Sequence, residues 1–229
     1  MRKRKLRIGV IRFPGSNCDF DTVNFFKKFG HNAEFVWYKN VRLPSVDLIV
    51  LPGGFAFGDR VYTKATGRYH IDPGALAATS SILAALKRAA GASMPILGVC
   101  NGFQILVKAG LLPGALAQND SKKFFCDSVP CRITGASFFE DASIHNKTFI
   151  IPVAHGYGKY VVSKKERAML AKNGQIFLEY ARRNPNGSVA NIAGVCNKER
   201  TIFGMMPHPE RSPDGHYFMH AIEKYVSAK

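Results

Sequence analysis

The sequence predicts an α/β fold with a mostly parallel sheet, helices on both of its faces and an antiparallel extension. In the first half, short apolar runs alternate with segments of helical spacing, which is typical of buried parallel strands joined by helices. From about Phe124, strand-like runs follow one another with little helix between them. The chain has 229 residues, 46% of them hydrophobic, so we expect one large domain over residues 1–229.

The elements of the first half follow from apolar patterning and from glycine and proline. Predicted strands are apolar runs before turn residues and cover residues 6–11, 33–38, 47–51 and 95–100. Predicted helices show helical spacing or are rich in alanine and cover residues 19–29, 74–90 and 101–109. Because sites in such sheets lie beyond the carboxyl ends of the strands, we expect Pro14-Gly15, Gly53-Gly54 and Cys100 to converge.

The second half is predicted to add mainly strands. The strand candidates are residues 131–134, 149–151, 160–162, 175–180, 189–195 and 201–205. The sequence Asn184-Pro-Asn-Gly187 favours a hairpin turn between residues 177–181 and 189–195. A closing helix is predicted at residues 216–226.

Composition narrows the class of protein. The 32 basic and 16 acidic residues give a formal net charge of +16. Such a charge is typical of a protein that binds nucleic acid or an acidic partner protein, or simply of a solvated basic surface. No RNA-binding signature accompanies the charge, so nucleic-acid binding is disfavoured. Arg7 and Arg12 interrupt the apolar run that a signal peptide would need, and no apolar run is long enough to span a membrane. We therefore expect a cytoplasmic protein.

The five cysteines are odd in number, scattered and without a C-x-x-C pair. This pattern favours reduced thiols and predicts neither a disulfide framework nor a metal site. Cys100 is the informative one, because it separates an apolar run from an amphipathic one and has Gly98 and Gly102 on either side. The G-x-C-x-G pattern predicts a sharp strand-to-helix turn that presents a nucleophile, at a helix N-terminus that favours the thiolate. The alternative is a small residue of the core.

A cysteine nucleophile needs a base and a group that orients the base. His208 follows a predicted strand, and Glu210 would lie on the same side of an extended segment and hold its imidazole. The alternative is a proline-rich surface loop. His155 is the rival base, although it has no local acidic partner.

Acyl chemistry at a thiolate also needs donors for an oxyanion. The N–H of Asn101 is well placed by the turn, and the Gly53-Gly54 segment suits a second donor unless it is an ordinary turn. Gln104 lies one helical turn after Cys100, where it can reach a substrate at the thiol or act as a packing amide.

Two motifs, Gly98-Val-Cys-Asn-Gly-Phe-Gln104 and Met206-Pro-His-Pro-Glu210, together resemble the triad (class I) glutamine amidotransferases. Within that group, the chain is most similar to the glutaminase subunits of phosphoribosylformylglycinamidine synthase. The motifs of this closer resemblance cover nearly the whole chain and include Phe13-Pro-Gly-Ser-Asn-Cys-Asp19, Leu51-Pro-Gly-Gly-Phe55, Ala154-His-Gly156, Asn184-Pro-Asn-Gly-Ser188 and Gly204-Met-Met-Pro-His-Pro-Glu-Arg211. The resemblance implies a flavodoxin-like fold of the class I amidotransferase type.

The resemblance implies residue roles. Cys100 attacks the side-chain amide of glutamine to give a thioester and ammonia, His208 moves protons, and Glu210 orients His208. Gly54 and Asn101 supply the oxyanion hole. Gly53, Gly54 and Gln104 contact glutamine.

The resemblance also implies partners. Ammonia passes to a synthetase subunit that converts formylglycinamide ribonucleotide to formylglycinamidine ribonucleotide in purine synthesis, and a small third subunit bridges the complex. ATP and magnesium belong to the synthetase, since this chain has no G-x-x-x-x-G-K-[ST] loop, and no cofactor or metal is expected here.

The chain departs from the family pattern twice. The family usually reads Gly-Asp-Tyr-Leu-Arg-Ala-Gly after the glycine loop, whereas residues 58–72 here are longer, basic and aromatic. This difference bears on partner docking and gating. The family commonly has Gly-Glu-Gly where this chain has Gly156-Tyr-Gly158. The change either weakens the grip on the α-amino group of glutamine or leaves Tyr157 as a simple loop residue.

Two other functions remain as alternatives. One is an amidotransferase subunit of a different synthetase, or a free-standing glutaminase. The other is a catalytically idle basic module that binds RNA or protein. The presence of Cys100, His208 and Glu210 together favours the enzyme.

Overall fold

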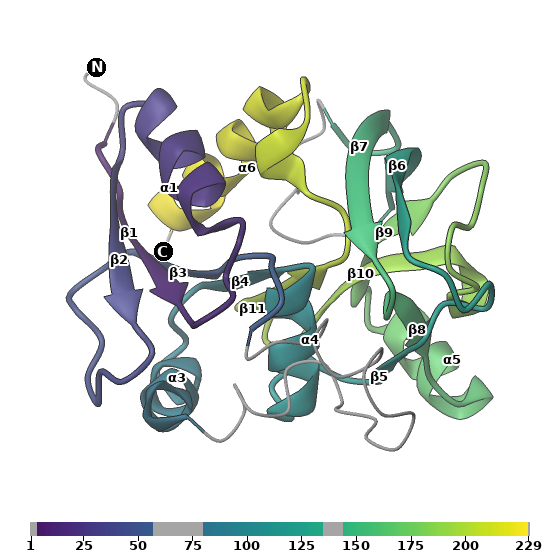
Figure 1. The fold of residues 1–229 in the computed structure, drawn as a ribbon, viewed down its shortest axis with the longest axis horizontal. Helices are drawn as coiled ribbons and strands as arrows, with labels where there is room; N and C mark the ends of the chain where they lie inside the picture. Colours follow the sequence, from purple (N-terminus) through teal and green to yellow (C-terminus); the bar gives the residue numbers. More distant parts are fainter. Residues whose placement is uncertain (1–3, 57–79, 135–143, 229) are drawn as a thin grey trace.

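The structure, a computed structural model, describes residues 4–56, 80–134 and 144–228. Its larger sheet consists of β1 (Arg7–Arg12), β2 (Asn32–Trp37), β3 (Leu48–Leu51), β4 (Ile96–Val99), β6 (Phe125–Ile133), β7 (Thr148–His155), β9 (Ile176–Tyr180), β10 (Ile192–Cys196) and β11 (Ile202–Met205). These nine strands lie in the order β2-β1-β3-β4-β11-β10-β9-β6-β7 (Figure 1).

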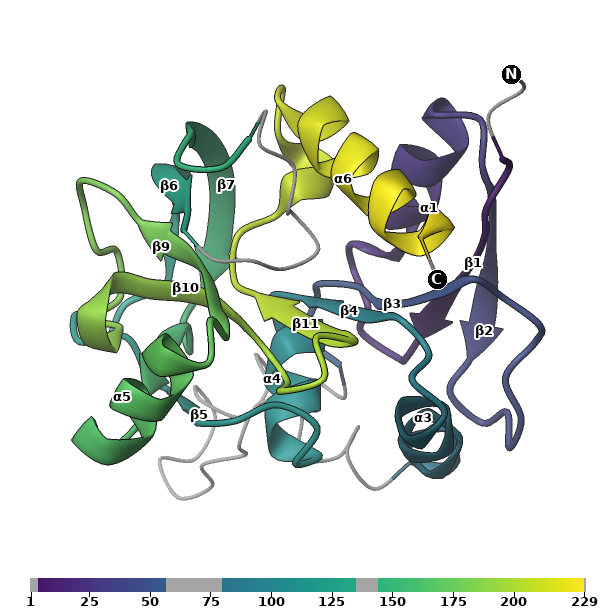
Figure 2. The ribbon, with the colours of Figure 1, turned by 180° about the vertical axis from the view of Figure 1, so that it is seen from behind.

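Half of this sheet is parallel. Parallel ladders join β2, β1, β3, β4 and β11. Every residue of β3 and β4 is buried, because helices cover the sheet on both sides. Helices α1 (Asp19–Lys28) and α6 (Gly215–Ser227) lie on one face, and α3 (Ser81–Gly91) and α4 (Asn101–Lys108) lie on the other (Figures 1 and 2). The predicted strands and helices of this half are confirmed. Within the residues that the structure describes, their predicted bounds agree with the observed ones to one or two residues.

The other half is antiparallel, as the sequence predicts. Antiparallel ladders join β11 to β10, β10 to β9, β9 to β6 and β6 to β7. The predicted pairing around Asn184-Pro-Asn-Gly187 is confirmed, although residues Val189–Asn191 form a short 3-10 helix before β10 begins. A separate two-stranded sheet pairs β5 (Ala115–Ala117) with β8 (Lys159–Val161).

Two expectations about the second half are wrong. Helix α5 (Lys164–Lys172) interrupts the run of strands, and it begins at a capping box in which Ser163 and Glu166 bond each other's backbone N–H. The segment after His208 is a 3-10 helix (Pro209–Arg211) and not extended chain. The unusual stretch 58–72 and the first part of the predicted helix 74–90 lie outside the described residues.

One hydrophobic core joins the two halves of the larger sheet. The ring of Phe203 on β11 contacts Phe177 on β9 at 5.9 Å between centroids and Tyr225 on α6 at 5.5 Å. These edge-to-face contacts link antiparallel strands, parallel strands and the closing helix. In the described ranges, we find no helix with both the length and the hydropathy required to cross a bilayer.

Candidate active site

The turn between β4 and α4 has the geometry predicted for a nucleophile. Cys100 has φ 50° and ψ −105°, a conformation that costs about 1–3 kcal/mol for a residue with a side chain. Its N–H donates to the carbonyl oxygen of Met205 at 2.8 Å, and its own carbonyl accepts from the N–H of Gln104 at 3.1 Å. The neighbouring strand and the first turn of α4 therefore hold the strained backbone in place.

The two glycines of the motif allow this turn to pack. A Cβ on Gly98 would lie 2.6 Å from Cδ1 of Leu106 and 2.7 Å from the backbone of Gly102. A Cβ on Gly102 would collide with the carbonyl oxygen of Leu51 at the end of β3. The spacing G-x-C-x-G is thus a packing requirement between α4 and two neighbouring strands.

The Cys100 thiol points to the end of β7. Its Sγ lies 3.6 Å from the carbonyl oxygen of Ala154, to which the S–H can donate, and the residue is 4% exposed. Cys100 is buried, as the alternative interpretation expects, and it directly follows β4 at the carboxyl end of that strand.

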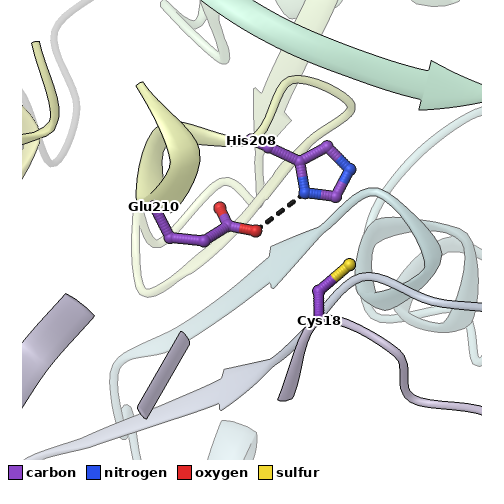
Figure 3. Close-up of side chains that lie close together, drawn as sticks. All are labelled: Cys18, His208 and Glu210. Carbon is purple, nitrogen blue, oxygen red and sulfur yellow. Dashed lines mark hydrogen bonds and ion pairs between the residues drawn. The ribbon is translucent and has the colours of Figure 1, made fainter. Parts of the chain in front are cut away.

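His208 and Glu210 form a buried pair next to this turn. Nδ1 of His208 lies 2.7 Å from Oε1 of Glu210, and their side chains are 2% and 3% exposed (Figure 3). The N–H of His208 donates to the carbonyl oxygen of Pro152 at 2.8 Å, which ties the residue to β7. The expected contact is present, although the 3-10 turn produces it and not an extended segment.

The charges around His208 favour its protonated form. Burial alone would lower the pKa of His208, but the Glu210 carboxylate, the Cys100 thiol and then the Cys18 thiol outweigh burial. Together they hold the pKa of His208 well above its usual value. The geometry therefore favours the imidazolium form of His208, with a proton available at Nε2 for a leaving group.

Gly53 lets the thiol and the imidazole meet. A Cβ on this glycine would lie 2.5 Å from Cε1 of His208, 3.1 Å from Sγ of Cys18 and 3.4 Å from Cβ of Cys100. Gly54 has φ +144° and packs against the segment before α1, where a Cβ would meet the backbone of Asn17 at 2.5 Å. The loop after β3 thus lies against both the thiol and the base.

The side chain of Asn101 ties this loop to α4. Its Oδ1 accepts from the N–H of Ala56 at 3.1 Å, and its Nδ2 donates to Oε1 of Gln104 at 2.9 Å. Nε2 of Gln104 donates to the carbonyl oxygen of Tyr157 at 2.8 Å. Asn101 and Gln104 therefore connect the loop after β3 to the loop after β7. The oxyanion role of Gly54 and Asn101, and the glutamine-binding role of Gly53, Gly54 and Gln104, stay predictions.

His155, the rival base, lies in a different environment. Its Nδ1 is 3.2 Å from Oδ1 of Asn119, and its Nε2 is 3.5 Å from Nδ2 of Asn186. Burial is the main cause that lowers the pKa of His155 to about 4; a backbone hydrogen bond opposes it, and the nearby charge of His208 adds a smaller lowering effect. Amides, and not a carboxylate, surround this neutral histidine, so the geometry favours His208 as the base.

Comparisons with known proteins agree with this geometry. The family model of the CobB/CobQ-like glutamine amidotransferase domain matches residues 5–226. Subunit PurQ of phosphoribosylformylglycinamidine synthase from Thermomicrobium roseum is 44% identical over 219 residues, which cover 91% of this chain and 89% of that protein. The subunit PurQ of Wolinella succinogenes is 42% identical over 210 residues, which cover 90% and 91%. The chain belongs to the CobB/CobQ-like glutamine amidotransferase family, among its PurQ subunits.

Solved structures support the same assignment. The structure described as PurLQS from Thermotoga maritima matches with a TM-score of 0.83 and 36% identity, over 97% of this chain and 100% of that one. A glutamine amidotransferase from the same organism matches with a TM-score of 0.58 at 12% identity, over 98% of this chain and 85% of that one. The second likeness concerns the fold alone. The fold predicted from the amidotransferase resemblance is thus confirmed.

Sequence reasoning gave one neighbour of the amidotransferase site no role. Cys18 is the N-cap residue of α1, and its N–H donates to the carbonyl oxygen of Gly53 at 3.2 Å. Its Sγ and donor atoms of His208 and Glu210 all lie within 4.8 Å of one another (Figure 3). The signal was available, because Cys18 follows Pro14-Gly15 at the same sheet edge as Cys100.

Proposed function

We propose that this chain is the glutaminase subunit of phosphoribosylformylglycinamidine synthase. It hydrolyses L-glutamine to glutamate and ammonia through a thioester on Cys100. The ammonia passes to a synthetase partner, which converts formylglycinamide ribonucleotide to formylglycinamidine ribonucleotide in purine biosynthesis. The observation that carries the proposal is the buried Glu210–His208 pair beside the strained Cys100 turn, in a chain 42–44% identical to PurQ subunits.

The first half of the reaction forms the thioester. The Cys100 thiolate attacks the amide carbon of glutamine, and the carbonyl electrons move to oxygen, where the N–H groups of Gly54 and Asn101 stabilise the oxyanion. When the oxyanion collapses, the C–N bond breaks, and His208 gives the proton on Nε2 to the leaving nitrogen. Ammonia leaves, and the acyl group remains on Sγ.

The second half releases glutamate. His208, now neutral, takes a proton from a water molecule that attacks the thioester carbon, and a second oxyanion forms in the same place. The C–S bond then breaks and restores the Cys100 thiolate and the His208 imidazolium. Glu210 keeps Nδ1 protonated and the ring in one orientation through both halves.

The proposed division of labour leaves ATP and magnesium with the synthetase. No residue of this chain is assigned to either, and ammonia is the only species that this chain supplies. The partners in the proposal are the synthetase subunit and a small bridging subunit, by analogy with the PurLQS structure that this chain matches. Such a complex would act in the cytoplasm, where purine precursors are made.

Ammonia release from glutamine tests this function. We expect strong release when the synthetase subunit, the small subunit, ATP, Mg²⁺ and formylglycinamide ribonucleotide are all present, and weak release when any one is left out. Equal release by the isolated chain would instead show a free-standing glutaminase. No release with the full set, together with salt-dependent retention on nucleic acid, would support the binding-module alternative.

A further inference from the structure

Cys18 places a second thiol beside the proposed nucleophile. Its Sγ and the Cβ of Cys100 lie 3.1 and 3.4 Å from the point where a Gly53 Cβ would be, and Cε1 of His208 lies 2.5 Å from that point. The three side chains therefore meet at Gly53, which has no side chain to separate them. The proposed reaction uses Cys100 and His208 and gives Cys18 no role.

The donor atoms of these three side chains match the preferences of a thiophilic cation. Two thiolates and an imidazole nitrogen are typical Zn²⁺ ligands, with Zn–S near 2.3 Å and Zn–N near 2.1 Å. Cys18 and Cys100 are the N-cap residues of α1 and α4, and each thiol would lose its proton when it binds a metal. Both cysteines are also buried.

His208 is oriented in the way that metal-binding histidines are. Its Nδ1 contacts the Glu210 carboxylate at 2.7 Å, as in the carboxylate–histidine pairs that support bound zinc. Its Nε2 is buried without a hydrogen-bond partner of good geometry among the described residues. A cation at Nε2 would satisfy this nitrogen and leave the Glu210 contact intact.

We propose that Cys18, Cys100 and His208 Nε2 form a binding site for Zn²⁺ that holds the nucleophile in an inactive form. A tetrahedral zinc ion keeps its donor atoms about 3.4–3.8 Å apart. The donor atoms of Cys18, His208 and Glu210 lie within 4.8 Å of one another, and the Cβ of Cys100 packs against Gly53 beside them. Zinc binding therefore requires the Cys100 side chain to turn its Sγ towards Cys18 and His208. Water or substrate fills the fourth position.

Zinc binding exchanges protons for the metal ion and needs no oxidant. Cys18 loses its S–H proton, and the Cys100–His208 pair loses the one proton that it shares, so about two protons leave for each ion bound. The Cys100 lone pair that would attack glutamine then forms the S–Zn bond. Inhibition rests on the proposed glutaminase function, whereas metal binding does not depend on it.

Metal titration of the full, reduced chain tests the site. We expect one Zn²⁺ per chain, release of about two protons, and with Co²⁺ a thiolate-to-metal charge-transfer absorption. The variants Cys18→Ser and Cys18→Ala should each weaken Zn²⁺ binding by at least about tenfold and release about one proton. The matched control is Cys126→Ser, since Cys126 is an exposed cysteine on β6, and it should bind Zn²⁺ as the wild type does.

The outcomes separate the two proposals. Wild-type affinity in both Cys18 variants, or Co²⁺ binding without the thiolate absorption, would overturn the metal site whether or not the chain is a glutaminase. Tight Zn²⁺ binding that requires Cys18, in a chain that never releases ammonia, would keep the site and remove the proposed function. If both hold, Zn²⁺ should inhibit ammonia release, and a chelator should restore it.

Discussion

At the scale of single residues, the site depends on one buried carboxylate that makes His208 a proton carrier. Glu210 contacts Nδ1 at 2.7 Å and opposes the effect of burial on the pKa of the imidazole. Without that charge, the imidazolium would be a buried cation with only thiols beside it. The identity of residue 210 therefore bears on both the rate and its pH dependence.

Replacing Glu210 with glutamine tests this dependence. Glu210→Gln keeps the shape, removes the charge and allows the wrong tautomer, so we expect kcat with glutamine to fall by about 10²- to 10⁴-fold. The pKa of His208 should fall, because the main raising effect is lost, and the alkaline limb of the rate profile should move to lower pH. Glu179→Gln, which alters a surface pair with Arg132, is the control and should keep the wild-type rate. An unchanged profile in Glu210→Gln would show that another group orients the base.

Gly53 acts at the same scale through its missing side chain. In Gly53→Ala, the new methyl group would lie 2.5 Å from Cε1 of His208 and would displace the ring. A displacement of about 1 Å costs on the order of 100-fold in rate, so we expect a comparable fall in kcat. Gly91→Ala is the control, since nothing lies within 4 Å of its Cβ position. Steady-state rates of the two folded variants decide the matter, and full activity in Gly53→Ala would contradict the geometry.

At the scale of elements, the junction between β4 and α4 depends on close packing. Helix α4 approaches β3 so closely that Gly102 contacts the carbonyl of Leu51 where any side chain would be. That contact fixes the direction of the helix dipole that points at Cys100.

Gly102→Ala should therefore affect stability as well as rate. The added methyl group would collide with the rigid backbone carbonyl of Leu51. We therefore expect a loss of about 1–3 kcal/mol in the free energy of unfolding. Urea denaturation measures this loss, and Gly91→Ala again serves as the reference substitution. A Gly102→Ala variant as stable as Gly91→Ala would mean that α4 can move away without cost.

The sequence predicts the parallel half of the sheet well, because its strands are continuous apolar runs ended by glycine or proline. Helix α5 was missed because eight of its nine residues are exposed, so almost no apolar face marks it. The Ser163–Glu166 capping box was the available sign. Strand β5 has only three residues and pairs with β8, which lies far along the chain. No local sequence pattern predicts such a pairing.

The residues brought together at the site were also largely predictable, since motif spacing and sheet topology place Cys100, the Gly53-Gly54 loop and His208 at one edge. The contact between His208 and Glu210 was expected for the wrong reason, because the prolines around His208 set up a 3-10 turn and not a strand. The proximity of Cys18 depends on tertiary packing of Gly53 against two helix N-termini, which spacing alone does not reveal.

At the scale of the whole molecule, the buried His155 makes the stability of the fold depend on pH. His155 is 2% exposed and held between amides, and burial lowers its pKa to about 4. The unfolded chain binds a proton here near pH 6.5, whereas the folded chain does so only near pH 4. The stability that this difference provides is fully present above pH 6.5 and is lost as the pH falls towards 4.

We expect the free energy of unfolding to decrease by about 3 kcal/mol between pH 6.5 and pH 4 through His155 alone. His155→Gln keeps a polar side chain that does not titrate, so its stability should depend less steeply on pH in this range, whatever its stability at pH 7. Urea unfolding at several pH values measures the slope. His145→Gln, at an exposed histidine, should retain the wild-type slope, and equal slopes in all three proteins would disprove a buried neutral His155.

In the proposed function, Cys100 generates ammonia for a partner. The most direct measurement is formylglycinamidine ribonucleotide synthesis by the assembled complex, with glutamine or with ammonium as nitrogen source, for wild type and Cys100→Ala. We predict that Cys100→Ala abolishes synthesis from glutamine and leaves synthesis from ammonium intact, since the synthetase chemistry is separate. Glutamine-dependent synthesis that survives in Cys100→Ala would contradict the assignment of the nucleophile and the proposed reaction with it.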